Sequence, residues 1–314
     1  MITGAAGQLG TDLALYIQKR RPAARILLTD IRPEAPQDLA DFRYQPLDVN
    51  DWPAFEQVLA DFAPTEIYHL AALLSGTAEK NPELAWQLNV QTQKHLFDVC
   101  VQTLPGVKVF FPSSIAVFGP GAGKFARQQA YLDPTSMYGV TKVAGEQLGN
   151  YYHFKHGLDV RSLRFPGLIS SKAMPGGGTT DYSVEIYHVA QQQDSYTCYL
   201  RDETPMPFLY MPDAMQAIEK LMAAPAPALT VRTSYNIHGF SATPKDFAAS
   251  IAEAQGRPFE LLSHPDFRQA IADSWPAELE DDAARKDWDW QPDFNLKAVT
   301  ADMLVAVGEA KQTV

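Results

Sequence analysis

Cysteine is nearly absent from this sequence. Cys100 and Cys198 are the only two thiols among 314 residues. Two thiols are too few for a disulfide framework or a cysteine-based zinc site, and they fit a reducing compartment. We therefore expect a cytoplasmic protein.

Positive charge and long apolar stretches are scarce as well. Lysine and arginine together number 26 against 37 acidic residues, which gives a formal net charge of −11. Such a charge repels nucleic-acid phosphates and anionic lipid. No apolar run approaches the roughly 20 residues that cross a bilayer, and the first residues lack the basic and then apolar layout of a signal peptide. We expect no nucleic-acid partner and no membrane association.

Motifs for metal ions are missing too. The seven histidines form no HExxH or similar cluster, and no dense run of carboxylates resembles a calcium loop. We interpret the histidines as surface or packing residues and predict that the protein binds no metal.

The first half of the chain alternates short apolar runs with amphipathic stretches, which is typical of βαβ units around a parallel sheet. Strands are expected at 25–30 (RILLTD), 66–70 (EIYHL), 108–113 (KVFFPS) and 159–165 (DVRSLRF). The sequence predicts an α/β protein with a Rossmann fold, a doubly wound parallel sheet with helices on both faces. Residues 1–3 would end a first strand, and the sequence leaves open whether the natural start lies upstream.

After residue 165 the sequence becomes irregular and rich in proline and glycine, as in PGLISSKAMPGGGTTDY and PMPFLYMP. Such a change in amino-acid composition indicates a domain boundary. We expect a dinucleotide-binding domain at residues 1–165 and a smaller, mainly substrate-binding domain at 166–314, some segments of which return to the Rossmann sheet.

Glycines stand three apart near the start of the chain, in GAAGQLG at residues 4–10. Glycine between a strand and a helix lets the backbone turn tightly and approach a pyrophosphate, whose charge then lies at the helix N-terminus. An ordinary strand-to-helix turn is the alternative interpretation. The predicted cofactor contacts of this loop are Gly4, Gly7, Gln8, Leu9 and Gly10.

Asp30 ends the next predicted strand, about 20 residues after the glycines, where dinucleotide folds place an acid on the adenosine ribose hydroxyls. Its carboxylate would repel a 2′-phosphate, so the sequence predicts NAD as the cofactor. The neighbouring Arg32 is a weaker opposite signal that could admit some NADP. A solvated acid at a strand end is the alternative for Asp30, and Ile31 joins the predicted contacts.

Three further segments complete the predicted cofactor site. Asp48 could accept a hydrogen bond from the adenine amine, and the small residues after 66–70 let the diphosphate and ribose lie against the sheet edge. Asn89 either holds a water that relays a proton or is a polar residue at the edge of the core. The set comprises Asp48, Val49, Leu70, Ala71, Ala72, Asn89 and Pro166.

Tyr138 and Lys142 form the most informative pair, because residues four apart face the same way on a helix. A YxxxK pattern occurs by chance in many helices, but this one follows a dinucleotide fingerprint and a strand end that carries Ser114. An adjacent ammonium and an oxidised nicotinamide would favour the tyrosine phenolate, while Ser114 could orient the same substrate oxygen. We predict Ser114, Tyr138 and Lys142 as catalytic residues.

Together these residues resemble the extended short-chain dehydrogenase/reductase family. Within it, the sequence is most similar to the epimerase-like L-threonine 3-dehydrogenases, a similarity carried by SSIAVFGP (113–120), RFPGLISSKAMPGGGTTDYSVEIYH (164–188), FLYMPDAMQAI (208–218) and IADSWPAELEDDAARKDWDWQPDFNL (271–296). The resemblance implies oxidation of L-threonine by NAD⁺ to 2-amino-3-oxobutyrate, with Tyr138 as acid/base and Lys142 also on the nicotinamide ribose. It implies substrate contacts at Ser75, Ser114, Tyr138, Thr179, Thr180 and Trp275. From the residues themselves, Gly176 to Gly178 could let this loop move as a lid, and a flexible interdomain linker is the alternative.

Two other functions compete with this one. A nucleotide-sugar epimerase or dehydratase would use the same scaffold, but it needs cationic groups for a diphosphate, and the second half of the chain has few clustered lysines or arginines. A non-catalytic NAD-sensing protein would be expected to lack Tyr138 or Lys142.

A homodimer is also expected. The segment 136–156 carries apolar residues beyond one helical stripe, and a helix that is apolar on more than one face is covered on more than one face. Two-fold dimers are the commonest soluble oligomers. In the family that this chain resembles, this helix and the one at 82–102 form a four-helix bundle between subunits. The apolar residues are Val140, Val143, Leu148, Tyr151, Tyr152 and Phe154, and Leu148 is expected to point outward.

Overall fold

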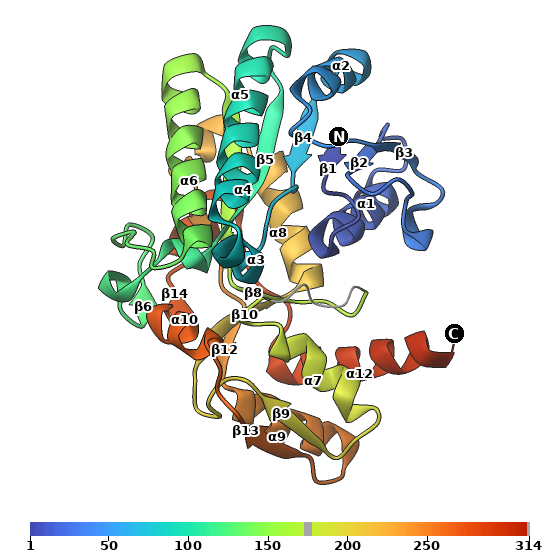
Figure 1. Ribbon diagram of the computed structural model, residues 1–314, viewed down its shortest axis with the longest axis vertical. Helices are drawn as coiled ribbons and strands as arrows, with labels where there is room; N and C mark the ends of the chain where they lie inside the picture. Colours follow the sequence, from blue (N-terminus) through green and yellow to red (C-terminus); the bar gives the residue numbers. More distant parts are fainter. Residues whose placement is uncertain (173–177, 313–314) are drawn as a thin grey trace.

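A seven-stranded parallel sheet organises the first part of the molecule (Figure 1). The computed structural model describes residues 1–172 and 178–312. The strand order is β11-β7-β5-β4-β1-β2-β3, which reverses direction beside β1 as in a Rossmann fold. This arrangement confirms the predicted fold class. The strands are β1 (Ile2–Thr3), β2 (Leu27–Asp30), β3 (Arg43–Pro46), β4 (Glu66–His69), β5 (Lys108–Ser114), β7 (Asp159–Phe165) and β11 (Tyr235–Asn236).

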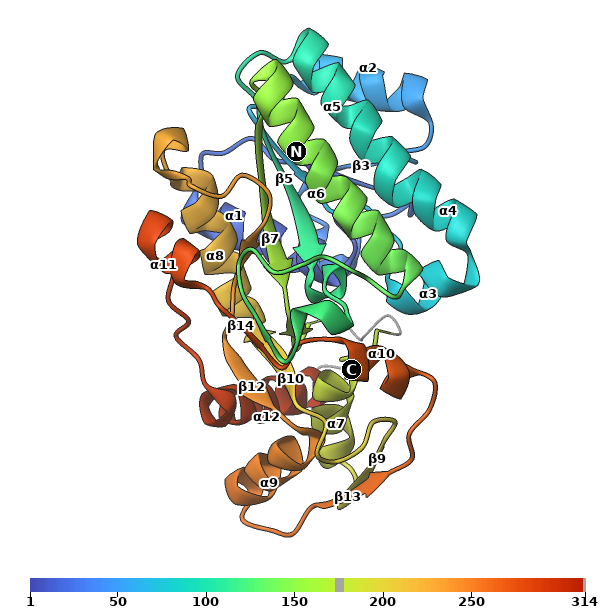
Figure 2. The same ribbon diagram turned by 90° about the vertical axis from the view of Figure 1, so that its left-hand side faces the viewer.

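Helices cover both faces of this sheet (Figures 1 and 2). One face packs against α1 (Gln8–Arg20), α8 (Met211–Ala223) and α11 (Asp282–Trp288). The other packs against α2 (Trp52–Phe62), α5 (Thr92–Thr103) and α6 (Met137–His156). Strands β5 and β7 lie between these two helix layers, so most of their residues are buried, including the polar Arg161, Ser162 and Arg164 of β7.

Shorter elements follow the carboxyl ends of the strands. After β4 come α3 (Ser75–Lys80), α4 (Pro82–Trp86) and a π-helix (Gln87–Gln91) that continues into α5. After β5 come two 3₁₀ turns and the short strand β6. These are Ile115–Val117, Pro120–Ala122 and Phe125–Ala126. The remaining 3₁₀ turns are Gln37–Leu39 and Ala226–Ala228.

A second group of elements lies beyond the carboxyl ends of the sheet (Figure 2) and packs around its own apolar cluster, called here the second apolar cluster. It contains a three-stranded sheet of β8 (Gly167–Ile169), β10 (Met206–Tyr210) and β12 (Phe240–Ala242). Two parallel pairs flank this sheet, β9 with β13 and β6 with β14. The other elements are β9 (Ser195–Cys198), β13 (Glu260–Ser263), β14 (Glu278–Leu279), α7 (Tyr182–Ala190), α9 (Pro244–Gln255), α10 (Arg268–Ser274) and α12 (Leu296–Gln312).

The division of the chain at residue 165 stays a proposal, because β11 and α8 come after that residue and yet pack in the Rossmann part. Among the residues that the structure describes, none of the helices combines the length and apolar character needed to span a membrane.

Candidate active site

The glycine loop connects β1 to α1 under tight steric limits. Gly4 has φ +65°, and a Cβ at this position would lie 2.7 Å from the backbone nitrogen of Ala71. A Cβ at Gly10 would lie 2.5 Å from the carbonyl oxygen of Gly4. Only glycine fits at both places, so the loop can pass directly over the end of β4, where Leu70 and Ala71 are held by the backbone and side chain of Thr3.

The N-terminus of α1 offers donors to an anion. Gly7 caps the helix without a side-chain hydrogen bond, and the first turn carries no acidic residue. The side-chain amide nitrogen of Gln8, Nε2, is buried there and has no hydrogen-bond partner among the described residues. A buried, unpartnered donor at a helix N-terminus fits the pyrophosphate of a dinucleotide. Leu9 is half-buried beside it.

Asp30 ends β2 next to this loop. Its carboxylate accepts hydrogen bonds from the backbone N–H groups of Ala6 at 3.0 Å and Arg32 at 3.2 Å. It therefore supports the glycine loop. The side chain of Ile31 is 71% exposed, so it is free to lie against an adenine ring. Asp48 is exposed and binds Asn50, whereas Val49 is buried.

Asn89 connects the end of β4 to helix α6. Its Oδ1 accepts the N–H of Leu73 at 2.8 Å, and its Nδ2 donates to the Leu73 carbonyl at 3.1 Å and to the Thr141 hydroxyl at 3.1 Å. Both amide hydrogens are used, so one acceptor lone pair is the capacity left for a water. Asn89 lies in the π-helix, a distortion that is frequent at functional sites.

The predicted catalytic residues converge between β5 and α6. Ser114 forms a hydrogen bond with Tyr138 and accepts the N–H of Ala116 at 3.1 Å. Lys142 is 7% exposed, and its Nζ lies 5.3 Å from the centre of the Tyr138 ring. The helix can approach the 3₁₀ turn after β5 closely because residue 139 is glycine: a Cβ there would lie 2.2 Å from the carbonyl oxygen of Ala116.

Burial opposes the charged forms of both groups. It raises the pKa of Tyr138 to about 12, although the hydrogen bond from Ser114 lowers it. It lowers the pKa of Lys142 to about 8, although the nearby carboxylate of Glu146 raises it. Lys142 therefore stays mainly protonated at pH 7 and Tyr138 stays neutral. A further positive charge beside the tyrosine is what its phenolate requires, and an oxidised nicotinamide supplies one.

Sequence reasoning missed a second cap on the catalytic helix. The side chain of Ser136 accepts the N–H of Gly139, as its position before the helix suggests. In addition, the carboxylate of Glu79 on α3 accepts the N–H of Met137 at 2.5 Å. This partner is 58 residues away in sequence, so no local pattern indicates it.

The predicted substrate contacts come from three segments. Ser75 begins α3 and is 6% exposed, and Thr179 is 2% exposed. Trp275 belongs to the same apolar cluster against which Tyr138 packs, and Lys124 donates to its carbonyl at 3.3 Å. Thr180 lies against Gly167, the first residue of β8, since a Cβ at Gly167 would be 2.9 Å from Thr180 Cβ. Pro166 directly precedes Gly167 in the chain. Gly176 and Gly177 lie outside the described residues.

Comparison with known proteins agrees with this geometry. Residues 1–237 match the NAD dependent epimerase/dehydratase family. The mitochondrial L-threonine 3-dehydrogenase of Bos taurus is 38% identical over 307 residues, covering 97% of this chain and 81% of that protein. The structure of the GalE-like L-threonine dehydrogenase of Cupriavidus necator in its holo form has a TM-score of 0.93 at 43% identity, covering 97% of this chain and 98% of that one.

A monomeric L-threonine 3-dehydrogenase from a metagenome, in its apo form, has a TM-score of 0.93 at 38% identity and covers 98% of each chain. The glycine loop, the helix N-terminus and Asp30 fit NAD by their own chemistry, and NAD is the cofactor of the family. On this sequence and structural agreement, the chain belongs to the NAD-dependent epimerase/dehydratase family of enzymes.

Proposed function

We propose that this enzyme oxidises the C3 hydroxyl of L-threonine to give 2-amino-3-oxobutyrate. The observation that carries the proposal is the convergence of Ser114, Tyr138 and Lys142 between β5 and α6. The names of the bovine and Cupriavidus relatives, which are similar over nearly the whole chain, support threonine as the substrate.

In this mechanism, bound NAD⁺ supplies the acceptor for the hydride that leaves C3. Tyr138 acts as the general base and takes the proton of the substrate hydroxyl onto its phenolate oxygen. Ser114 donates a hydrogen bond to the same substrate oxygen and orients it. The ammonium of Lys142 stabilises the phenolate electrostatically, and its bond to the Pro112 carbonyl at 2.7 Å holds it in place.

The substrate is proposed to lie between α3 and the second apolar cluster. The hydroxyls of Ser75, Thr179 and Thr180 can donate to the carboxylate of an amino acid, and Trp275 closes the site on its apolar side. A nucleotide-sugar would need additional cationic groups for its diphosphate in this region.

A substrate panel tests the proposal. NADH formation is followed at 340 nm with L-threonine, L-serine, 3-hydroxybutyrate and a UDP-sugar. We expect turnover with L-threonine well above that with the other three. Conversion of the UDP-sugar without threonine oxidation would instead identify a sugar-nucleotide enzyme, and NAD binding without any turnover would identify a non-catalytic binding protein.

We also propose a homodimer joined through a four-helix bundle. The outer faces of α4, α5 and α6 expose a set of large apolar side chains, and two-fold association would cover them. These are Leu84 (45% exposed), Val101 (38%), Val140 (40%), Tyr151 (53%) and Phe154 (77%). The expectation for Leu148 was wrong: it is half-buried and packs against the core beneath α6, because it lies one position off the stripe of Val140 and Tyr151.

Light scattering at micromolar concentration tests this interface, since the metagenomic relative is described as monomeric. We expect twice the chain mass for the unmodified protein and a single-chain mass for Tyr151→Asp. Gln147→Glu, an exposed change on the same helix, serves as a control for the effect of charge alone. A single-chain mass for the unmodified protein would contradict the dimer.

For localisation we propose the cytoplasm. Both thiols are buried and unpaired, as a reducing compartment allows. The bovine relative is named as mitochondrial, so fractionation of the native host would decide between the two compartments.

A further inference from the structure

Three consecutive residues at the end of β5 each contact a different residue of α6. The helix residues are four apart, so they share one face of the helix. The contacts are a hydrogen bond from Lys142 Nζ to the Pro112 carbonyl at 2.7 Å, one from Ser113 Oγ to Glu146 Oε1 at 2.5 Å, and one between Ser114 and Tyr138. Lys142 and Tyr138, which make the first and third of these contacts, act in the proposed mechanism. Glu146, which makes the second, has no role in it so far.

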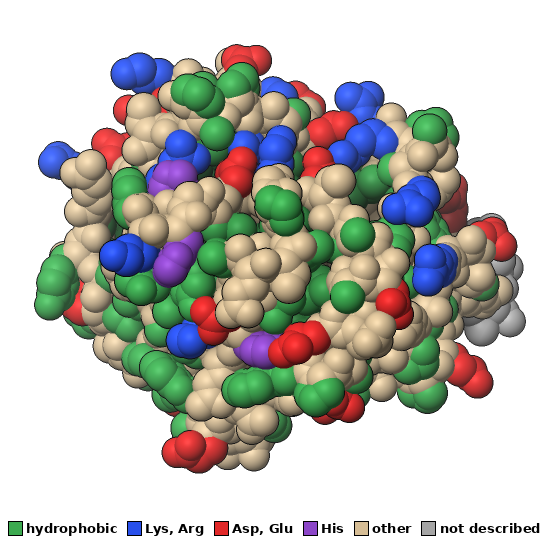
Figure 3. Space-filling view, turned by 90° about the horizontal axis from the view of Figure 1, so that it is seen from above, with side chains coloured by type: hydrophobic (Ala, Val, Ile, Leu, Met, Phe, Trp, Pro, Cys, Tyr) green, Lys and Arg blue, Asp and Glu red, His purple; other side chains and the backbone are tan. Residues whose placement is uncertain are grey.

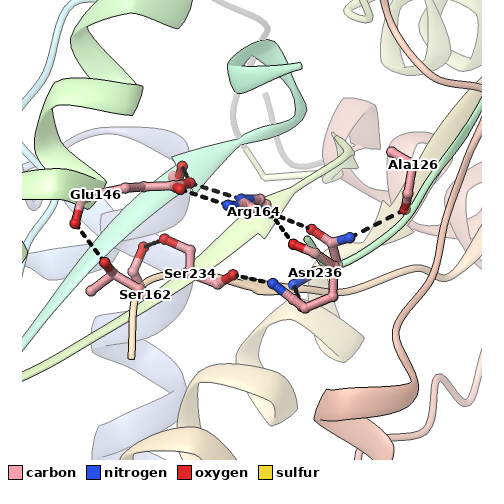
Figure 4. Close-up of polar contacts among 9 residues, drawn as sticks. Ala126, Glu146, Ser162, Arg164, Ser234 and Asn236 are labelled. Carbon is pink, nitrogen blue, oxygen red and sulfur yellow. Dashed lines mark hydrogen bonds and ion pairs between the residues drawn. The ribbon is translucent and has the colours of Figure 1, made fainter. Parts of the chain in front are cut away.

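Glu146 is held by a buried network rather than by solvent. Its side chain is 1% exposed and that of Arg164 on β7 is 6% exposed. The guanidinium of Arg164 binds both carboxylate oxygens, at 2.9 Å from Nε and 2.7 Å from Nη2 (Figure 4). With the Ser113 hydroxyl, this gives three donors to one carboxylate that lies between the helix and the sheet.

The same arginine extends the network toward the predicted substrate side. Arg164 donates from Nη1 to the carbonyl of Gln128 at 3.0 Å and to Asn236 at 3.2 Å (Figure 4). The backbone of Gln128 donates to Glu280 at 2.9 Å. Glu280 follows β14, which pairs with β6 and comes shortly after Trp275. One charged pair therefore joins the catalytic helix, the strand end and the segment that leads to the tryptophan.

We propose that Glu146 is a positioning residue, whose carboxylate fixes the strand end carrying Ser114 relative to the helix carrying Tyr138 and Lys142. The inference rests on the proposed function. A buried ion pair often contributes little net stability compared with apolar residues of the same volume, and the role that we assign to this one is to define the geometry of the groups that it joins. Small displacements of reacting groups are costly, about 10²-fold for roughly 1 Å.

The negative charge of Glu146 should also affect the pH dependence of the rate, which a purely structural role would leave unchanged. The charged or titratable groups near Lys142 are Tyr138 and Glu146 on its own helix, His69 on β4 and Arg164 on β7. Replacing Glu146 with glutamine removes the one negative charge in this set and leaves Arg164 without a counterion. Both changes disfavour the ammonium of Lys142, so the alkaline limb of the rate should move to lower pH.

The test compares two buried ion pairs on the same strand. Glu146→Gln breaks the pair of Arg164, and Asp159→Asn breaks the pair of Arg161, whose 2.7 Å contact lies at the far end of β7. Each variant leaves a buried arginine without its carboxylate. We expect Glu146→Gln to lower kcat by about 10- to 100-fold with little change in KM, and to shift the alkaline limb downward. Asp159→Asn should reduce the unfolding temperature but keep kcat and the pH profile.

A third variant covers the case in which Glu146→Gln does not fold. Ser113→Ala leaves the Glu146–Arg164 pair intact and removes only the 2.5 Å bond to the strand end. We expect it to lower kcat by about 3- to 10-fold at an unfolding temperature close to that of the unmodified protein.

Several outcomes would overturn the inference. These are unchanged kcat in Ser113→Ala, an unmoved alkaline limb in Glu146→Gln, or equal losses of activity in Glu146→Gln and Asp159→Asn. Failure of the proposed function has a different result, because the unmodified protein would then not oxidise L-threonine. In that case the variants are compared on whichever substrate of the panel the protein converts, and the same expectations apply.

Discussion

At the amino end of the parallel sheet, charged side chains pair with one another, whereas at the carboxyl end some charged and polar groups have no such partner. Arg21 binds Glu66 at 2.9 Å, and the same carboxylate accepts from Tyr68. Arg161 binds Asp159 and three carbonyl oxygens at the end of α8. Figure 3 looks down on this end of the molecule, where basic and acidic side chains are interspersed.

The carboxyl end is arranged differently. Glu146 and Arg164 pair with each other there, but within the described part of the chain Lys142 forms no ion pair, and the side-chain amide nitrogen of Gln8 has no hydrogen-bond partner. Charges and donors that are left unmatched by protein groups are available to a ligand. We therefore expect most substitutions at the amino end of the sheet to lower the unfolding temperature, and most of those at the carboxyl end to lower the rate of catalysis.

The largest expected effect is that of Tyr138→Phe, at the carboxyl end. Removing the hydroxyl should lower kcat by about 10²–10⁴-fold, the usual contribution of a positioned acid/base. NADH affinity, measured by fluorescence titration, and unfolding temperature should stay close to those of the unmodified protein. Near-normal turnover would remove Tyr138 from the mechanism.

A smaller change is expected for cofactor choice. Asp30 accepts the Ala6 N–H at 3.0 Å in the unmodified protein. Asp30→Asn keeps an oxygen that can accept this N–H and removes the charge that repels a 2′-phosphate. The ratio of kcat/KM for NAD over NADP should fall by about 10- to 100-fold. Steady-state rates with both cofactors measure it. Equal use of NAD and NADP by the unmodified enzyme would contradict the role given to Asp30.

His69 sharpens the comparison because it lies at the carboxyl end and yet should act on stability. Burial lowers its pKa from 6.5 to about 4, so the folded protein favours the neutral ring. This contribution is fully present above pH 6.5 and is lost as the pH falls toward 4, by up to about 3 kcal/mol. Urea unfolding at pH 7 and pH 4.5 should show a smaller difference in His69→Leu than in the unmodified protein. The same difference in both would refute the assignment.

The smallest expected effect is that of chelation. The described residues contain no group of three histidine, cysteine or acidic side chains placed to bind a metal. Prolonged dialysis against EDTA should therefore leave kcat unchanged. Activity that is lost on dialysis and restored by zinc would reverse the prediction.

Two central strands of the sheet were predicted closely from sequence, whereas its two edge strands, β3 and β11, were not. Strand β7 has its predicted bounds, and β5 extends one residue beyond the prediction; β5 contains the apolar run Val109 to Phe111, and the apolar residues of β7 are Val160, Leu163 and Phe165. Strand β3 (Arg43–Pro46) has no counterpart among the expected strands, because it is an edge strand and none of its residues is buried. Its pairing with β2 depends on tertiary contacts that no local pattern carries.

The residues of the site were also predictable from sequence only in part. Ser114, Tyr138 and Lys142 could be identified because their chemistry requires particular residue types at particular spacings. Glu79 and Arg164 could not, since their partners lie 58 and 18 residues away and the contacts depend on how the elements pack.

Strand β11 makes the folding of the two halves of the chain interdependent. Tyr235 and Asn236 pair with β7 only after the chain has built β8, β9 and β10, and α8 from the same half covers one face of the sheet. A fragment ending at residue 165 would leave the edge of β7 unpaired and the apolar side of α1 uncovered. We therefore expect the chain to unfold as one cooperative unit and a fragment of residues 1–165 to aggregate, which means that the substrate half must be made before the cofactor half is complete.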